Sequence, residues 1–193
     1  MIFELLLAVY FSYLLGSIPS GVIIAKFFSL GELNKIGSGN TGATNVLRTG
    51  NYWAAGLTLI IDFFKAYIAI SICIIINGDL IILSASVILL GHIFPVWIEN
   101  LKGGKGFASF LGILCALNIA LMIFVCIVWL IIFVKNKISS VSTLISANIS
   151  GFYSLIFLDL STSLTLLFLN LIIIFSHQEN IKRLIKGTES KIL

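Results

Sequence analysis

The feature that most constrains the fold of this chain is a series of long apolar runs separated by short polar segments. Residues 52–76 and 139–158 are two such runs, and a helix needs about 20 residues to cross a bilayer. Backbone amides inside hydrocarbon must be satisfied internally, which leaves helices or closed barrels. Hydrophobic residues make up 59% of the chain and the mean hydropathy is +1.14, which excludes an ordinary soluble domain. We therefore predict an all-α integral membrane protein with a single membrane domain over residues 1–193.

The charges indicate how many times the chain crosses. Residues 1–28 lack the basic start of a cleaved signal and carry Glu4, so we interpret them as a retained first span, kinked at Pro19. Residues 107–134 would form a helix of about 42 Å, too long for a hydrocarbon core of about 30 Å. A turn near Leu117 and Asn118 would divide this run into two short helices. Every basic loop then lies on the cytoplasmic side, as the positive-inside rule requires. The basic residues of those loops are Lys35, Arg48, Lys102, Lys105, Lys135, Lys137, Lys182, Arg183, Lys186 and Lys191, and the acids of the opposite turns are Glu4, Asp79 and Asp159.

The predicted fold is a compact bundle of seven transmembrane helices, some short or kinked, with the N-terminus outside and the C-terminus in the cytoplasm. Cytoplasmic motif loops are expected at about 30–50, 98–106 and 177–193. Inside the spans, Asp62 and Lys65 share one helical face and are predicted to pair with each other; a catalytic role for them is the alternative. His92 is assigned a structural role. Ser17 and Ser20 are the expected partners of the carbonyls that Pro19 frees; the alternative is that the break shapes a cavity.

The first polar segment, residues 37–48, reads GSGNTGATNVLR. Successive amides in a glycine-rich turn form a concave site for anions, and an arginine fork suits phosphate or carboxylate. We predict an anion-binding loop; the alternative is a flexible connection. Its candidate ligand-binding residues are Ser38, Gly39, Asn40, Thr41, Thr44, Asn45 and Arg48.

Two further polar segments lie on the same predicted side. Residues 99–106, ENLKGGKG, combine Lys102 and Lys105 with glycines that permit close backbone approach, so they are interpreted as a second anion loop or as a basic turn that only fixes topology. The spacing is not that of a nucleotide P-loop. At the start of residues 177–193, His177 and Asn180 stand one helical turn apart. Near them in the predicted topology, Ser139, Ser142 and Ser146 lie close to one helix face, although such serines usually bond back to their own helix.

The sequence gives no sign of a metal site or cofactor. Cys73, Cys115 and Cys126 lie in apolar runs without paired spacing, and the acids are scattered. The formal net charge of +4 reflects the flanks of membrane helices, which face anionic lipid, and does not indicate nucleic acid. No obligate protein partner is inferred.

Through essentially its whole length the chain resembles the bacterial acyl-phosphate-dependent glycerol-3-phosphate acyltransferases. The resemblance rests on three motifs, GSGNTGATNVLR, LKGGKGFAS and HQENIKRLIKGTE. It implies a small seven-helix enzyme of the bacterial inner membrane with its active site facing the cytoplasm. The implied catalytic residues are Ser38, Arg48, Lys105, His177 and Asn180. It also implies functional roles for Gly103, Gly104, Gly106 and Ser142, and a structural role for Glu189.

The implied reaction transfers a fatty acyl group from acyl phosphate to the sn-1 hydroxyl of glycerol 3-phosphate, giving lysophosphatidic acid for phospholipid synthesis. Acyl phosphate is a mixed anhydride with a good leaving group, so positioning and charge stabilisation would be the main task. The resemblance implies that the substrate's phosphate accepts the proton; His177 is the alternative base. The alternatives to an enzyme are a small transporter or channel for phosphorylated metabolites, and a structural subunit of a membrane complex.

Overall fold

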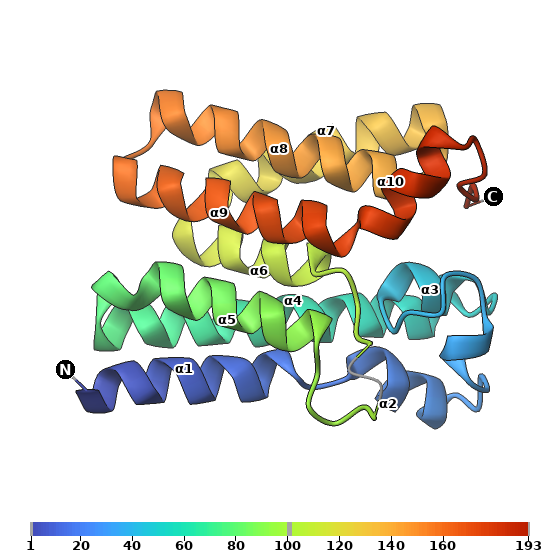
Figure 1. Cartoon of the computed structure of the whole chain (residues 1–193), viewed down its shortest axis with the longest axis horizontal. Coiled ribbons are helices and arrows are strands. Elements are labelled where there is room, and N and C mark those ends of the chain that lie inside the picture. Colours follow the sequence, from blue (N-terminus) through green and yellow to red (C-terminus); the bar gives the residue numbers. More distant parts are fainter. Residues whose placement is uncertain (1, 100–101, 193) are drawn as a thin grey trace.

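The computed structural model describes residues 2–99 and 102–192, and its regular secondary structure over those residues consists of helices (Figure 1). Residues 100 and 101, which belong to the predicted second loop, lie outside the described residues, as do 1 and 193. The prediction of an all-helical integral membrane fold is confirmed. The α-helices are α1 (Ile2–Gly16), α2 (Ser20–Phe27), α3 (Ala43–Leu47), α4 (Tyr52–Ile76), α5 (Ile81–Ile93), α6 (Phe107–Leu117), α7 (Ile119–Asn136), α8 (Ser139–Phe157), α9 (Leu160–Ser176) and α10 (Gln178–Ile185), with short 3₁₀ turns η1 (Leu33–Lys35) and η2 (Gly78–Leu80).

Within the described residues, 4 segments are long and apolar enough to cross a membrane, and a fifth is obtained if α9 and α10 are taken together despite the 62° bend between them. The first of the four, Ile2–Phe27, joins α1 and α2. The apolar helices Gly78–Ile93 and Phe107–Leu117 are shorter. The predicted count of seven stays a prediction, because it requires both short helices to count as spans.

The predicted turn near Leu117 and Asn118 is confirmed, since α6 ends at Leu117 and α7 begins at Ile119. The backbone of Asn118 is extended, and its side chain accepts a hydrogen bond from the amide of Leu121 at 2.9 Å. Asparagine is a good N-cap because its side chain satisfies an amide that the new helix leaves free. A single polar residue in a long apolar run therefore ends one helix and starts the next.

The predicted kink at Pro19 is confirmed as a break between α1 and α2. The carbonyl that Pro19 frees is that of Leu15, four residues earlier, and it accepts a bond from the amide of Ile18 at 3.2 Å. The expectation that Ser17 and Ser20 satisfy it is therefore wrong, and Ser17 Oγ has no partner among the described residues. The Ile18 carbonyl accepts a bond from the Lys65 ammonium at 3.0 Å. Ser20 instead donates to the Asp62 carboxylate at 2.6 Å. The predicted ion pair of Asp62 and Lys65 is confirmed, with 2.7 Å between Nζ and Oδ1. Charges buried among helices are retained when they are paired in this way.

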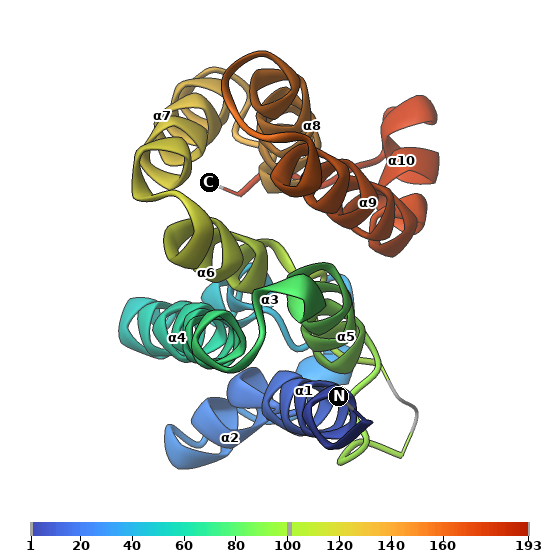
Figure 2. The same ribbon diagram turned by 90° about the vertical axis from the view of Figure 1, so that its left-hand side faces the viewer.

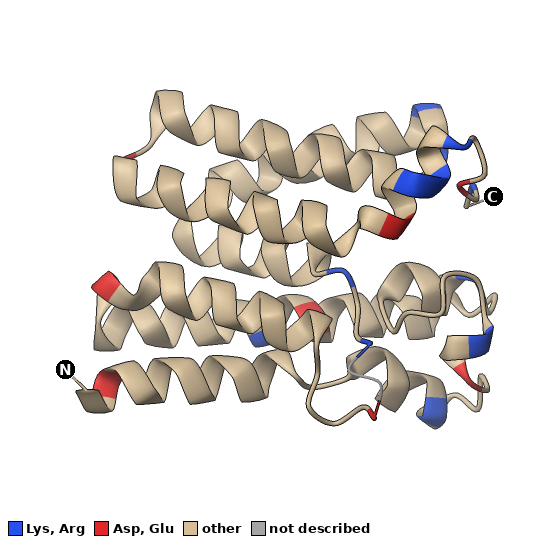
Figure 3. Cartoon of the chain, viewed as in Figure 1, with Lys and Arg blue, Asp and Glu red and all other residues tan. Residues whose placement is uncertain are grey.

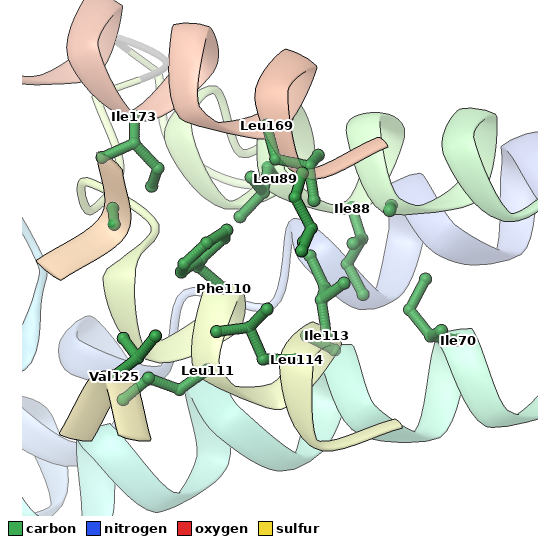
Figure 4. Close-up of a cluster of buried hydrophobic side chains, with 14 of the residues drawn as sticks. Ile70, Ile88, Leu89, Phe110, Leu111, Ile113, Leu114, Val125, Leu169 and Ile173 are labelled. Carbon is green, nitrogen blue, oxygen red and sulfur yellow. The ribbon is translucent and has the colours of Figure 1, made fainter. Parts of the chain in front are cut away.

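Short helix α6 lies between the two halves of the bundle. Figure 2 shows it between α4 and α5 on one side and α7 to α9 on the other. Its Phe110 and Leu114 are fully buried, and they pack in one core with Leu89 of α5 and Leu169 and Ile173 of α9 (Figure 4). Close approach to α4 requires a glycine, because a Cβ at Gly112 would collide with the backbone carbonyl of Phe63. This packing fixes the N-terminal end of α6 near the centre of the bundle.

The charged residues are segregated along the bundle. Figure 3 shows Lys and Arg gathered mainly at the end where α2, α3 and α10 lie, with some acidic segments among them, whereas the charged segments at the opposite end, near the N-terminus, are acidic. The loops that carry the three sequence motifs also lie at the basic end (Figure 1). That end is therefore where an anionic ligand would be attracted.

Candidate active site

A cavity of about 380 Å³ opens where the three motif segments meet. Its wall includes all five predicted catalytic residues, which come from three distant parts of the chain. The roles of these residues stay predictions, but their common position is a property of the fold. The predicted site residues in the wall are Ser38, Asn40, Thr44, Arg48, Lys105, Gly106, His177 and Asn180.

The first loop is held in shape by Asn45. Its Oδ1 accepts hydrogen bonds from the Ser38 amide at 3.1 Å and from Arg48 Nη1 at 3.3 Å, while its Nδ2 donates to the carbonyls of Leu33 and Asn40. The side chain is fully buried, and among the described residues it is not part of the cavity wall. We interpret Asn45 as a structural residue that fixes Ser38 and Arg48. Gly39 and Thr41, also predicted to bind substrate, are likewise outside the wall.

The second loop brings Lys105 and Gly106 to the cavity, but not Gly103 and Gly104. The amides of Gly103 and Gly104 donate to the carbonyls of Ile93 and His92 at 2.9 and 3.1 Å. A Cβ on Gly103 would collide with the His92 carbonyl, and one on Gly104 would collide with the His92 ring. These two glycines are therefore needed for packing against α5, and their role in substrate binding stays a prediction.

Helix α6 begins at this loop with its N-terminal end in the cavity wall. Gly106 is the N-cap, with a φ of 89° that favours glycine, and no side chain caps the helix. Phe107 and Ala108, the first residues of α6, also line the cavity. The first amides of a helix lack partners within the helix and carry a partial positive charge. An anion in the cavity could accept hydrogen bonds from them.

Two cationic side chains line the same region. Burial lowers the pKa of Arg48, which donates from Nη2 to Ser190 Oγ at 2.6 Å. Burial also lowers the pKa of Lys105 to about 8, an effect that nearby Glu189 partly opposes. Across residues 2–99 and 102–192, no hydrogen bond or ion pair of the Lys105 ammonium is found. A partly buried ammonium without a partner is a suitable site for an anionic ligand.

His177 and Asn180 offer hydrogen-bond acceptors to the cavity, in contrast to the cationic donors Arg48 and Lys105. Burial lowers the pKa of His177 to about 4, so its ring is neutral near pH 7. Its Nδ1 lies 2.8 Å from the carbonyl of Ile173, which can only accept; the ring proton is therefore on Nδ1, and Nε2 is an acceptor. Asn180 donates from Nδ2 to Glu189 at 2.5 Å, while its buried Oδ1 has no partner within the described part of the chain. The two side chains offer acceptors suited to hydroxyl groups.

Another part of the cavity wall is apolar. Its wall is formed by α4, α6 and α7, and on α4 both Gly56 and Leu59 are exposed on the side of the bundle. Trp129 stacks on Phe133 with 4.8 Å between ring centroids and donates to Thr143 Oγ1 at 3.2 Å. Such a surface favours an alkyl chain over water. The apolar part of the wall comprises Ala55, Gly56, Leu59, Phe107, Ala108, Leu111, Cys126, Trp129 and Phe133.

Ser142 is the predicted residue of α8 that the structure does not bring to the cavity. It is fully buried and donates to the carbonyl of Ile138 at 3.1 Å, whereas Ser139, Ser140 and Thr143 line the wall. Sequence reasoning also missed Ser190 beside Arg48. Glu189, predicted to be structural, accepts bonds from Ser140, Asn180 and Arg183, and so connects the C-terminal segment to α8 and α10.

Comparisons with known proteins identify the family of this chain. Residues 6–187 match the family described as Glycerol-3-phosphate acyltransferase. A glycerol-3-phosphate acyltransferase of Cereibacter sphaeroides is 45% identical over 93% of this chain and 86% of its own length, and one of Pelagibacter ubique is 39% identical over 97% of each. The crystal structure of PlsY, an integral membrane glycerol 3-phosphate acyltransferase, in its glycerol 3-phosphate form has a TM-score of 0.91 at 32% identity and covers 98% of this chain and 96% of its own. The lysophosphatidic acid form of PlsY has a TM-score of 0.88 at 31% identity and covers 98% and 95%. The chain therefore belongs to the glycerol-3-phosphate acyltransferase family.

Proposed function

We propose that this protein transfers a fatty acyl group from acyl phosphate to the sn-1 hydroxyl of glycerol 3-phosphate, releasing lysophosphatidic acid and phosphate for phospholipid synthesis. The observation that carries the proposal is one cavity with a cationic region, two hydroxyl acceptors and an apolar region side by side. Glycerol 3-phosphate has a phosphate and hydroxyls, and an acyl phosphate has a phosphate and an alkyl chain. Each region therefore has a counterpart in the two substrates, and the glycerol 3-phosphate and lysophosphatidic acid forms of the PlsY relative support this assignment.

The cationic region binds the phosphate groups. Arg48 offers a fork of donors, Lys105 a point charge, and the first turn of α6 free amides, with Ser38 Oγ beside them. These groups also stabilise the negative charge that develops on the leaving phosphate.

His177 and Asn180 orient the glycerol. The sn-1 hydroxyl attacks the carbonyl carbon of the acyl phosphate, the bond from that carbon to the phosphate oxygen breaks, and the hydroxyl proton passes to phosphate. Asn180 Oδ1 and His177 Nε2 accept hydrogen bonds from hydroxyls of the glycerol backbone. A histidine with a pKa of about 4 is a weak base, which favours a binding role for His177 and leaves the proton to the phosphate. No step in this scheme requires a cofactor.

The acyl chain occupies the apolar part of the cavity. Because Gly56 and Leu59 are exposed on the side of α4, the donor enters laterally from the lipid. We further propose that α5 and α6 count as spans, which gives seven. The basic end and the active site then face the cytoplasm, as the positive-inside rule expects, and the N-terminus lies outside in a bacterial inner membrane.

The test is purified wild-type protein in lipid vesicles, supplied with palmitoyl phosphate and radiolabelled glycerol 3-phosphate. We expect lysophosphatidic acid and phosphate in equal amounts. Arg48→Ala should lose most of this activity, whereas Ser84→Ala, which removes a buried bond to Ser12 Oγ on α1, should keep it. Uptake of label into the vesicles without a lipid product would overturn the proposal and support a transporter.

A further inference from the structure

A buried ion cluster, formed by Asp62 and Lys65 of α4 and His92 of α5, lies beside the cavity. An ammonium group has three N–H donors. Lys65 Nζ has an acceptor for each: Asp62 Oδ1 at 2.7 Å, the Ile18 carbonyl at 3.0 Å and His92 Nδ1 at 3.0 Å. Asp62 Oδ1 also accepts a bond from Ser20 at 2.6 Å. Each N–H donor of the Lys65 ammonium therefore has an acceptor within the protein.

These contacts determine which nitrogen of His92 carries the ring proton. Asp62 Oδ1 is also near Nδ1, at 3.3 Å, so a proton on Nδ1 could in principle be donated to it. However, a protonated Nδ1 would direct its hydrogen toward the Lys65 ammonium only 3.0 Å away, and that ammonium is held charged by Asp62. Nδ1 is therefore the acceptor, and the neutral ring has its proton on Nε2.

The Nε2 edge of His92 faces the second loop. It packs against Gly104, where any Cβ would collide with it, and His92 is part of the cavity wall together with Lys105. The residue is only 6% exposed, and in the described ranges no hydrogen-bond partner of Nε2 is found. Nε2 is not among the enclosed unpartnered atoms of the described residues, and His92 lines the cavity, so its N–H is open to a ligand oxygen there.

We propose that His92 is a further substrate-binding residue, whose Nε2–H donates to a phosphoryl oxygen bound beside Lys105, and that Asp62 and Lys65 are positioning residues that fix its ring. The inference rests on the proposed function, because it takes its ligand from that reaction. The ion cluster is neutral overall, so it orients the donor without repelling a phosphate dianion. Either substrate could supply the phosphoryl oxygen, and the kinetic constants distinguish the two.

The test uses two amide substitutions that separate the ring nitrogens. In His92→Asn the amide oxygen can take the place of Nδ1 and accept from Lys65, but the donor at Nε2 is lost. In His92→Gln the amide nitrogen can take the place of Nε2, but the acceptor for Lys65 is lost. Losing a hydrogen bond to a charged group corresponds to a change of roughly 10- to 100-fold. We expect His92→Asn to raise KM for one phosphate-bearing substrate by that factor with near wild-type thermal stability. His92→Gln should be less stable but closer to the wild type in KM.

An NMR measurement and a control variant make this test independent of turnover and of folding. Nitrogen NMR of ¹⁵N-histidine-labelled protein should show His92 as the Nε2–H tautomer, with a resonance that shifts when glycerol 3-phosphate or inorganic phosphate is added. Ser84→Ala serves as the matched control for loss of a buried polar contact. A wild-type KM for both substrates in His92→Asn, or an Nδ1–H tautomer, would overturn the inference. An inactive wild type would contradict the proposed function instead, while the NMR titration would still decide the role of His92.

Discussion

The charge state of Lys105 should set the alkaline limit of activity. Burial lowers the pKa of this lysine to about 8, and among the described residues its ammonium has no partner. In the free enzyme the side chain loses its proton as the pH rises through that value. With a pKa of about 8, about nine-tenths of the molecules are charged near pH 7 and about one-tenth near pH 9.

If phosphate binding needs the charged form, kcat/KM for glycerol 3-phosphate should fall about tenfold between pH 7 and pH 9. A bound phosphate favours the ammonium, so the corresponding limb in kcat should lie at higher pH. The assay is initial-rate kinetics at constant ionic strength over this range, with spontaneous hydrolysis of the acyl phosphate subtracted.

Two variants test whether deprotonation of Lys105 causes this fall of kcat/KM at alkaline pH. Lys105→Arg stays charged throughout, so its kcat/KM profile should be flat above pH 8, at a lower level because a guanidinium fork differs in shape from an ammonium. Lys105→Met should also be flat and roughly 10- to 100-fold below the wild type near pH 7, as expected for a lost bond to a charged group. A limb near pH 8 that persists in Lys105→Arg would refute the assignment.

Three further predictions concern other parts of the site. His177→Ala should raise KM for glycerol 3-phosphate while the pH profile above pH 5 keeps its shape, because a group with a pKa of about 4 is already neutral there; loss of a limb near pH 6.5 would contradict this. Gly56→Leu should shorten the longest acyl phosphate that reacts, with KM for glycerol 3-phosphate unchanged, because a Cβ there has open space beside the apolar part of the cavity. Asp62→Asn should destabilise the fold by about 3–5 kcal/mol, measured by unfolding in detergent, because it leaves Lys65 charged and buried without its carboxylate. Stability equal to that of Ser84→Ala would show that the pair is not needed.

The sequence predicted the features of the fold that depend on charge and hydropathy. The break at Asn118 followed from keeping every basic loop on one side, and the Asp62–Lys65 pair followed from spacing on one helix. Partners from other helices were not predictable in this way. His92 was assigned a structural role, but its position in the cavity wall depends on how α5 packs against α4 and the second loop.

The prediction of residues that line the cavity was most accurate for residue types that suit few roles other than ligand binding. Arg48, Lys105 and His177 reach the cavity, and few structural roles suit them at loop positions. Glycines and small polar residues were harder to assign. Gly103 and Gly104 accommodate His92, and Asn45 holds its own loop. Neither role follows from residue type, because it depends on how an irregular loop folds back on its neighbours. Ser142 belongs to a serine-rich run in which several registers look alike, and only packing selects the face of Ser139 and Thr143.

The most direct test of the account is to follow the sn-1 oxygen of glycerol 3-phosphate through the reaction. The wild-type protein is supplied with palmitoyl phosphate and with glycerol 3-phosphate labelled with ¹⁸O at the sn-1 hydroxyl, and both products are analysed by mass spectrometry. Direct attack of the hydroxyl on the carbonyl carbon predicts the label in the ester of lysophosphatidic acid and none in the released phosphate. Unlabelled lysophosphatidic acid, labelled phosphate, or no lipid product at all would contradict it.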